Sequence, residues 1–227
     1  MSEFAEVLAT LRRIRGISPF FALDIGRPSG EWLPGESLVD GSGALDRTVD
    51  AIARRYRTDE RRVATSLFFL SYTSRVLSPV VGALVVDNRM LDVRPGNLWW
   101  HYAPDTGLQV RIDSPGGGPG IEDALRPVVK AIRDVVPVAE GLLWGNAASS
   151  AAGALRMVLR SGTASEAECG GWGERLWSTP PLAETGEFLS FPGDLFSGDL
   201  VFRRRSCCLY YRLDNGGKCG DCPLVKA

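Results

Sequence analysis

Sulfur is concentrated at the C-terminal end of the chain. Four of its five cysteines lie within sixteen residues, in the spacing C-C-x10-C-x2-C: Cys207, Cys208, Cys219 and Cys222. Clustered thiolates are the usual ligands of structural zinc and of iron–sulfur clusters, and neighbouring thiols can also cycle through a disulfide. The segment therefore predicts metal or thiol chemistry.

The spacing of these cysteines bears on which chemistry it is. A C-x-x-C turn brings its end Cα atoms within about 7 Å, so the thiolates of Cys219 and Cys222 can face one metal atom. The turn-forming residues 214–217 let the chain reverse, so that the two cysteine pairs can meet. Adjacent cysteines fit poorly around one zinc ion, because neighbouring side chains of an extended chain point to opposite faces. The spacing favours a [2Fe–2S] cluster. Two alternatives stay open: a zinc-stabilised binding or regulatory protein, and a thiol redox sensor that uses adjacent Cys207 and Cys208 as a strained disulfide.

A family resemblance extends beyond the cysteines. The C-C-x10-C-x2-C terminus resembles that of the FhuF-type siderophore ferric reductases. Upstream, Leu143-Trp144-Gly145-Asn146 followed by Arg156 is similar to the family's W-G-N helix, and Tyr72, Arg75 and Pro79 resemble its central helix. Residues 1–60 contribute nothing to this resemblance, which is sharp only at the cysteines.

The resemblance implies a function. It makes Cys207, Cys208, Cys219 and Cys222 the ligands of a [2Fe–2S] cluster, which reduces the Fe(III) of a ferric siderophore by one electron. Because the chelator binds the larger and less charged Fe(II) less tightly, this electron releases the iron. No dinucleotide fingerprint or phosphate-loop lysine is visible in the sequence. An external electron donor, such as a ferredoxin or a flavin-dependent reductase, is therefore implied.

Further candidate residues surround or precede the cysteines. Cations near a cluster favour its more negative reduced form, so the arginines beside the cysteines are candidates for tuning the potential or binding the substrate: Arg203, Arg204, Arg205 and Arg212. A solvated strand end would explain the same run of arginines. His101, next to Trp100, suggests an aromatic platform for a chelate, although packed strand histidines are more common. We expect Cys169 to be a free thiol, Trp144 to lie in the core and Asn146 to cap a helix.

Composition limits the class of protein. The 227 residues are 44% apolar and 23% charged, with a formal net charge of −1, so no overall field points to nucleic acid or an acidic membrane. The first twenty residues lack the unbroken apolar core of a secretory signal. The most apolar stretch, residues 63–86, contains Arg75 and Pro79 and suits a buried helix better than a membrane span. We expect a cytoplasmic protein that does not span a membrane, and association with a membrane surface stays open.

Hydrophobic periodicity and turn residues predict the elements. Helices are expected over residues 1–16, 42–57, 121–138 and 142–159, together with a long helix that opens at Thr58 and breaks or kinks near Pro79. A hairpin joins 97–102 to 107–113, 114–120 is a flexible connector, and 161–187 is irregular. The predicted fold is a mostly helical α+β domain, residues 1–187, with a small antiparallel sheet. The Cys-rich segment 188–227 packs on it as part of one structural unit.

Overall fold

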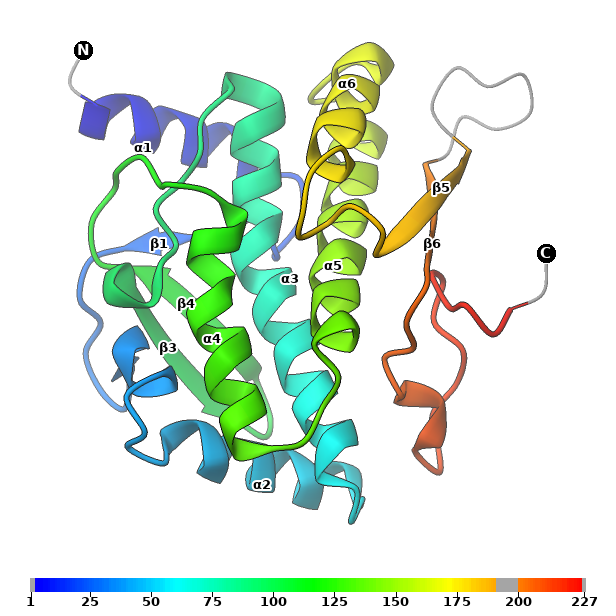
Figure 1. Cartoon of the computed structure of the whole chain (residues 1–227). Coiled ribbons are helices and arrows are strands. Elements are labelled where there is room, and N and C mark those ends of the chain that lie inside the picture. Colours follow the sequence, from blue (N-terminus) through cyan, green and yellow to red (C-terminus); the bar gives the residue numbers. More distant parts are fainter. Residues whose placement is uncertain (1–2, 191–199, 226–227) are drawn as a thin grey trace.

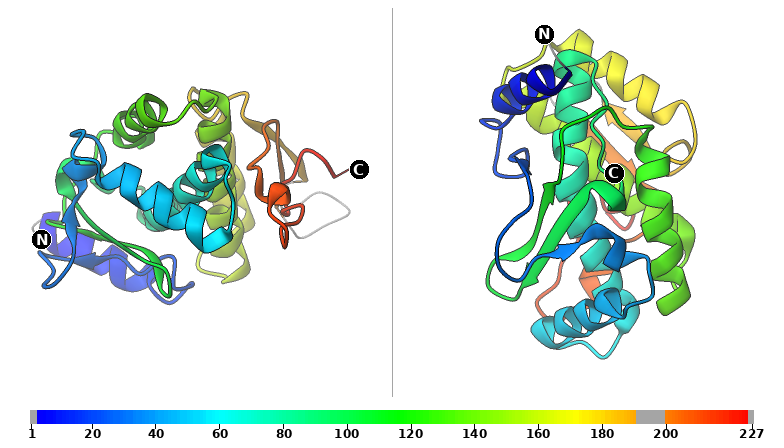
Figure 2. Two further views of the ribbon diagram at one scale, coloured as in Figure 1. Left: turned by 90° about the horizontal axis from the view of Figure 1, so that it is seen from below. Right: turned by 90° about the vertical axis from the view of Figure 1, so that its left-hand side faces the viewer.

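Two long helices form the centre of the protein. The computed structural model describes residues 3–190 and 200–225. Helix α3 (Arg61–Asp87) runs through the middle, and α5 (Glu140–Arg160) packs along it. The sheet and α1 lie on one side of this pair, and the C-terminal segment lies on the other (Figures 1 and 2). The remaining helices are α1 (Glu3–Ile14), α2 (Ala44–Tyr56), α4 (Ile121–Val135) and α6 (Glu166–Trp177).

Helix α3 supplies much of the core. Phe68, Phe69, Tyr72 and Val76 are fully buried on it. The sequence predicted a break or a kink near Pro79, but the helix continues without a break to Asp87. A proline inside a helix removes one backbone hydrogen bond, and here burial on all sides from residue 76 to residue 85 holds the helix together. By length and composition α3 could span a membrane, but 72% of its most apolar window is buried inside the protein, as in the core helix of a globular domain.

The larger sheet has four short strands. The predicted hairpin is confirmed: β3 (Leu98–Ala103) pairs antiparallel with β4 (Gly107–Ile112). Two further strands lie at the edges, β2 (Leu33–Pro34) antiparallel to β3 and β1 (Asp24–Ile25) parallel to β4. The sheet is therefore mixed rather than purely antiparallel. The buried faces of β3 and β4 pack toward α3, which separates the sheet from the C-terminal segment.

The prediction of an irregular segment over residues 161–187 is wrong. Helix α6 begins at a capping box, in which Ser165 Oγ accepts a hydrogen bond from the Glu168 amide and the Glu168 carboxylate accepts one from the Ser165 amide. Cys169 is buried on this helix. The S-x-x-E pattern was visible in the sequence and is a known signal for a helix start.

The C-terminal segment packs on α5. Strands β5 (Gly186–Ser190) and β6 (Val201–Arg204) form a two-stranded antiparallel sheet beside that helix. Gly145 lets the chain approach closely, because a Cβ at this position would lie 2.0 Å from Ser206 Oγ. The mostly helical α+β fold with a Cys-rich C-terminal segment is thus confirmed.

A tight turn reverses this segment where the sequence predicted it. The Gly216 amide donates to the Leu213 carbonyl at 2.8 Å, with Asp214 and Asn215 in the turn. A Cβ on Gly216 would lie 1.9 Å from the Tyr210 carbonyl oxygen, whereas a Cβ on Gly217 would have no neighbour within 4 Å. Only a glycine therefore fits at the first of these two positions.

This difference is testable with matched variants. We expect Gly216→Ala to open the turn, since a side chain would have to displace backbone. Backbone amide hydrogen exchange over residues 204–224 should accelerate by roughly tenfold or more. Gly217→Ala should exchange like the wild type. Equal protection in the two variants would contradict this account of the turn.

Candidate thiolate centre

The segment that carries the four clustered cysteines lies on the far side of the helix pair from the larger sheet (Figure 1). Cys207 and Cys208 follow β6, and Cys219 and Cys222 flank a turn closed by a hydrogen bond from the Cys222 amide to the Cys219 carbonyl, 3.1 Å long. The sulfurs of Cys208 and Cys219 are 3.8 Å apart. Over residues 3–190 and 200–225, no three His, Cys, Asp or Glu side chains lie close enough together to hold one metal ion. The arrangement contains one close thiol pair rather than four convergent thiols.

A left-handed residue accommodates the two adjacent cysteines. Leu209 has φ of 66°, which is uncommon outside glycine, and the chain turns there. Its amide donates to the sulfur of Cys207 at 3.3 Å. The extended chain assumed from the sequence, in which neighbouring side chains point apart, is therefore replaced by a turn that gives each of the two sulfurs its own partner.

A buried arginine faces the close thiol pair. Arg204 is only 1% exposed, and its Nη2 donates to the sulfur of Cys219 at 3.3 Å. No carboxylate in the described part of the chain forms an ion pair with it. A buried guanidinium without a nearby anion costs several kcal/mol. The groups placed to balance this charge are the thiols, provided that they are ionised.

A closed ring of contacts holds this pair. Arg204 Nη1 donates to Asn146 Oδ1 at 2.6 Å, and Asn146 Nδ2 donates to both the carbonyl and the hydroxyl of Ser66 at 3.0 Å. Ser66 Oγ then donates to the Cys208 carbonyl at 2.7 Å. The ring closes through the contact between the sulfurs of Cys208 and Cys219. It ties α3, α5, β6 and both cysteines together.

Asn146 is therefore not a helix cap, as expected from the sequence. It lies within α5, is fully buried, and uses its amide to connect Ser66 with Arg204. Sequence reasoning missed this role and that of Ser66. A signal existed, because a buried polar side chain in an apolar helix requires partners, but the sequence does not say which.

An acidic residue anchors the second cysteine turn. Asp221 accepts hydrogen bonds from the hydroxyl of Ser149 and, at 3.1 Å, from the guanidinium of Arg156. Its carbonyl accepts the Arg204 amide, also at 3.1 Å. The turn that carries Cys219 and Cys222 is thereby fixed to α5. Asp221 was not singled out from the sequence.

The environment favours a negative charge on the thiol pair. A hydrogen bond from Cys219 and the positive charge of Arg204 lower the pKa of Cys208 to about 6, against the opposing effect of burial. The pKa of Cys219 is raised because it donates its proton to Cys208 and is partly desolvated. Both effects favour a single proton shared by the two sulfurs, with the negative charge beside Arg204.

The other arginine candidates lie farther from the thiols. Arg205 is exposed and donates to the Glu184 carbonyl at 3.2 Å. Arg212 pairs with Glu60 at 2.7 Å on the surface. Arg203, on β6, faces the opposite side of the strand from Arg204, because side chains alternate along it. Of the predicted run, only Arg204 contacts a cysteine.

Three other predicted features are not part of this centre. Trp100 is 1% exposed and bonded through Nε1 to Ser37 Oγ, so it offers no surface to a chelate and the platform hypothesis is wrong for it. His101 lies on the same strand, 3.1 Å from the Glu31 carbonyl. Cys169 is buried on α6, where burial raises the pKa of its thiol to about 11. Trp144 lies in the core, as expected.

The residues present suit a metal–thiolate group. Metal–sulfur bonds of about 2.3 Å in tetrahedral geometry place two sulfurs about 3.8 Å apart, and the sulfurs of Cys208 and Cys219 are 3.8 Å apart. The buried cation supplies the positive charge that an anionic cluster requires. The spacing of this pair therefore matches two of the four thiolate ligands that a [2Fe–2S] cluster takes.

Comparison with known proteins gives this centre an identity. Residues 204–224 match the family model described as the FhuF 2Fe-2S C-terminal domain. The matched residues begin at the buried arginine and include all four cysteines and Asp221. No curated protein matches the chain. Residues 204–224 are therefore an FhuF-type 2Fe-2S domain, and the cofactor to which this domain points is a [2Fe–2S] cluster.

Proposed function

We propose that this protein reduces the Fe(III) of a ferric siderophore to Fe(II), one electron at a time, and so releases the iron. The observation that carries the proposal is buried Arg204 beside a close thiol pair, within the FhuF-type domain. A [2Fe–2S] cluster supplies one-electron chemistry, which matches the single electron that separates Fe(III) from Fe(II). A fixed cation next to the sulfurs favours the extra negative charge of the reduced state.

The proposed ligands are the four clustered cysteines. Cys207, Cys208, Cys219 and Cys222 supply the four thiolates that such a cluster normally takes. We further infer that Cys208 and Cys219 bind the same iron, since their sulfurs already have the spacing of two ligands on one tetrahedral metal. Cys207 and Cys222 then bind the second iron.

Exposure around the centre supports exchange of electrons with external molecules. Cys207 and Cys219 are half-buried, while Tyr210, Tyr211 and Lys218 nearby are exposed. A ferric siderophore and an external donor, such as a ferredoxin or a flavin-dependent reductase, can each approach this surface. The reaction belongs in the cytoplasm, where thiols are kept reduced.

A second function is favoured by one observation. Cys208 and Cys219 are in contact, and the pKa of Cys208 is lowered to about 6, as in a reactive thiol. A thiol redox switch would therefore use this pair rather than the adjacent Cys207 and Cys208 that the sequence suggested. Such a switch needs no metal.

The proposed reaction is tested with anaerobically purified protein. We expect iron and acid-labile sulfide in equal amounts, visible absorption that bleaches on reduction with dithionite, and recovery of that absorption when a ferric siderophore is added. A ferrous-ion trap should then report one Fe(II) for each cluster re-oxidised.

Three results would contradict this function in different ways. Zinc in place of iron and sulfide would indicate a zinc-stabilised binding protein. Metal-free protein with reversible loss of two thiols would indicate the redox switch. A reducible cluster that no ferric chelate re-oxidises would indicate electron transfer to another acceptor.

The ligand assignment predicts the outcome of serine substitution. Serine at any of the four clustered cysteines should abolish or alter the cluster spectrum, since a hydroxyl is a poorer ligand for iron. Cys169→Ser is the control and should keep the wild-type spectrum, because this thiol is buried on α6. An unchanged spectrum in one of the four variants would remove that residue from the ligand set.

Sharing of one iron can be read from the same variants. Mössbauer spectra of the reduced proteins should fall into two classes, Cys208→Ser with Cys219→Ser and Cys207→Ser with Cys222→Ser, because each class alters a different iron. A grouping of Cys207 with Cys208 would refute the pairing. If serine variants lose the cluster, oxidation of the metal-free wild type should link Cys208 to Cys219, as peptide mapping would show.

Arg204 should raise the reduction potential. A cation about 6 Å from the added electron, at an effective dielectric constant of about 20, contributes about 2.8 kcal/mol, or about 120 mV for one electron. Arg204→Gln keeps a hydrogen-bond donor and removes the charge, so the potential should fall by on the order of 100 mV in an anaerobic titration. Exposed Arg205→Gln should shift it far less, since solvent and salt screen its charge. Equal shifts in the two variants would rule out a special role for Arg204.

A further inference from the structure

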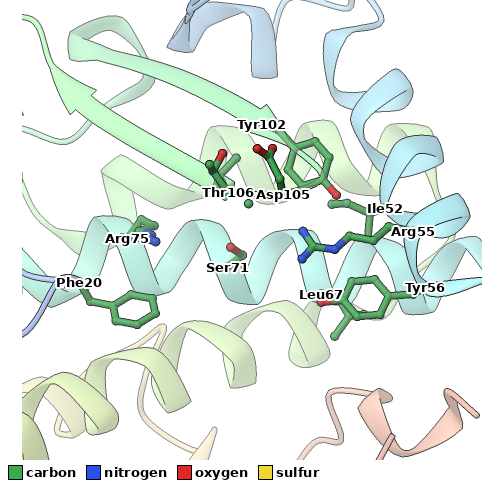
Figure 3. A pocket seen from close by; sticks show the side chains of 12 residues that line it. Phe20, Ile52, Arg55, Tyr56, Leu67, Ser71, Arg75, Tyr102, Asp105 and Thr106 are labelled. Atoms are coloured by element: carbon green, nitrogen blue, oxygen red, sulfur yellow. The ribbon is translucent and has the colours of Figure 1, made fainter. Parts of the chain in front are cut away.

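A cavity lies on the opposite side of α3 from the cysteines. We call it the hairpin pocket, because it lies between the β3–β4 hairpin, α2 and α3 (Figure 3). Its volume is about 250 Å³, enough for about eight water molecules. Ser66, which bonds to the Cys208 carbonyl, and Arg75, which lines the pocket, are nine residues apart on α3. This is two and a half helical turns, so the two residues face opposite sides.

The charge of Arg75 is not balanced by the protein. This guanidinium is half-buried, donates one hydrogen bond to the Pro19 carbonyl at 3.3 Å, and lies 4.6 Å from the centre of the Phe20 ring. Burial lowers its pKa. No carboxylate among the described residues is within ion-pair distance, and most of the five N–H groups of the guanidinium have no protein acceptor there. A half-buried cation that borders a cavity is stabilised by an anion in that cavity.

A second cation reaches the same space. Figure 3 shows the guanidinium of Arg55 directed along α3 toward Ser71, below Asp105. Arg55 also has no ion-pair partner in the part of the chain that the structure describes. Asp105 is the acidic side chain of the lining, so two cations oppose one carboxylate. The pocket therefore has an excess of positive charge.

We propose that the hairpin pocket binds the carboxylate groups of a small organic anion. Arg75 and Arg55 would take the carboxylates, for which the planar guanidinium is suited. Phe20 and Tyr56 supply apolar surface at the rim. The anion is either a free polycarboxylic acid or the carboxylate groups of an iron chelate. Only the second source rests on the proposed reductase function.

Calorimetry on the cluster-loaded protein tests the proposal. The probes are citrate and the complex of citrate with Ga(III). The Ga(III) ion has the charge and nearly the size of Fe(III) but is not reduced. We expect at least one probe to bind the wild type, and Arg75→Ala and Arg55→Ala to weaken that binding by about tenfold or more. Arg54→Ala is the matched control on the same helix and should bind like the wild type, because Arg54 does not line the pocket.

These measurements distinguish a free acid from an iron chelate as the ligand, and they test anion binding independently of the reductase function. Binding of citrate alone assigns the pocket to a free acid, and tighter binding of the gallium complex assigns it to a chelate. The proposal is overturned if neither probe binds at millimolar concentration, or if the Arg55 variant, whose exposed side chain leaves the fold intact, binds like the wild type. Cluster absorption and its bleaching are recorded on the same samples. A failure of the reductase function would appear in the cluster absorption and its bleaching. The heats of binding do not depend on any reduction, so they test the pocket separately.

Discussion

The contact between the buried guanidinium of Arg204 and the sulfur of Cys219 determines the C-terminal architecture. A cation that is 1% exposed is unfavourable unless negative charge lies beside it, and no described carboxylate fills that role. The thiols can fill it only as thiolates or as metal ligands. The buried charge of Arg204 therefore makes the stability of the C-terminal segment depend on ionised cysteine sulfur. The same charge also makes these thiols easier to ionise. Positive charge inside the protein and negative charge on the cysteines are stable only together.

This dependence explains why α3 and α5 carry polar groups inside an apolar core. Ser66 and Asn146 are both fully buried, and each uses its hydrogen-bonding groups on the ring around Cys208 and Cys219. The β5–β6 part of the C-terminal segment packs through buried Leu200 and Phe202, with Phe202 against Trp177. The part that carries the cysteines is held by this ring and by Asp221 on α5. Because such a segment orders around its metal, folding and cofactor binding are coupled there.

Local sequence patterns predicted part of this structure. The features that they did not predict depend mostly on partners that are distant in the sequence. Helical periodicity gave the central helices, alternation and turn residues gave the β3–β4 hairpin, and residues 214–217 gave the turn between the cysteines. Helix α6 was missed although its capping box is local. The continuity of α3 through Pro79 could not be predicted, since it depends on packing from all sides. The selection of Arg204 from three consecutive arginines depends on Asn146, 58 residues away in sequence, and no spacing rule reports such a contact.

An arginine removed wholly or partly from solvent lies on each side of α3, and its positive charge is balanced in a different way on each side. Arg204 is sealed from solvent, so its counter-charge has to be permanent, and a cluster held by thiolates is permanent. Arg75 is only half-buried and borders a cavity, so water can partly solvate it while the pocket is empty and an anion can replace that water. A fixed charge suits a redox cofactor, whose potential it sets. An exchangeable counter-charge suits a ligand that arrives and leaves, and α3 keeps the two apart by its own thickness of about 10 Å.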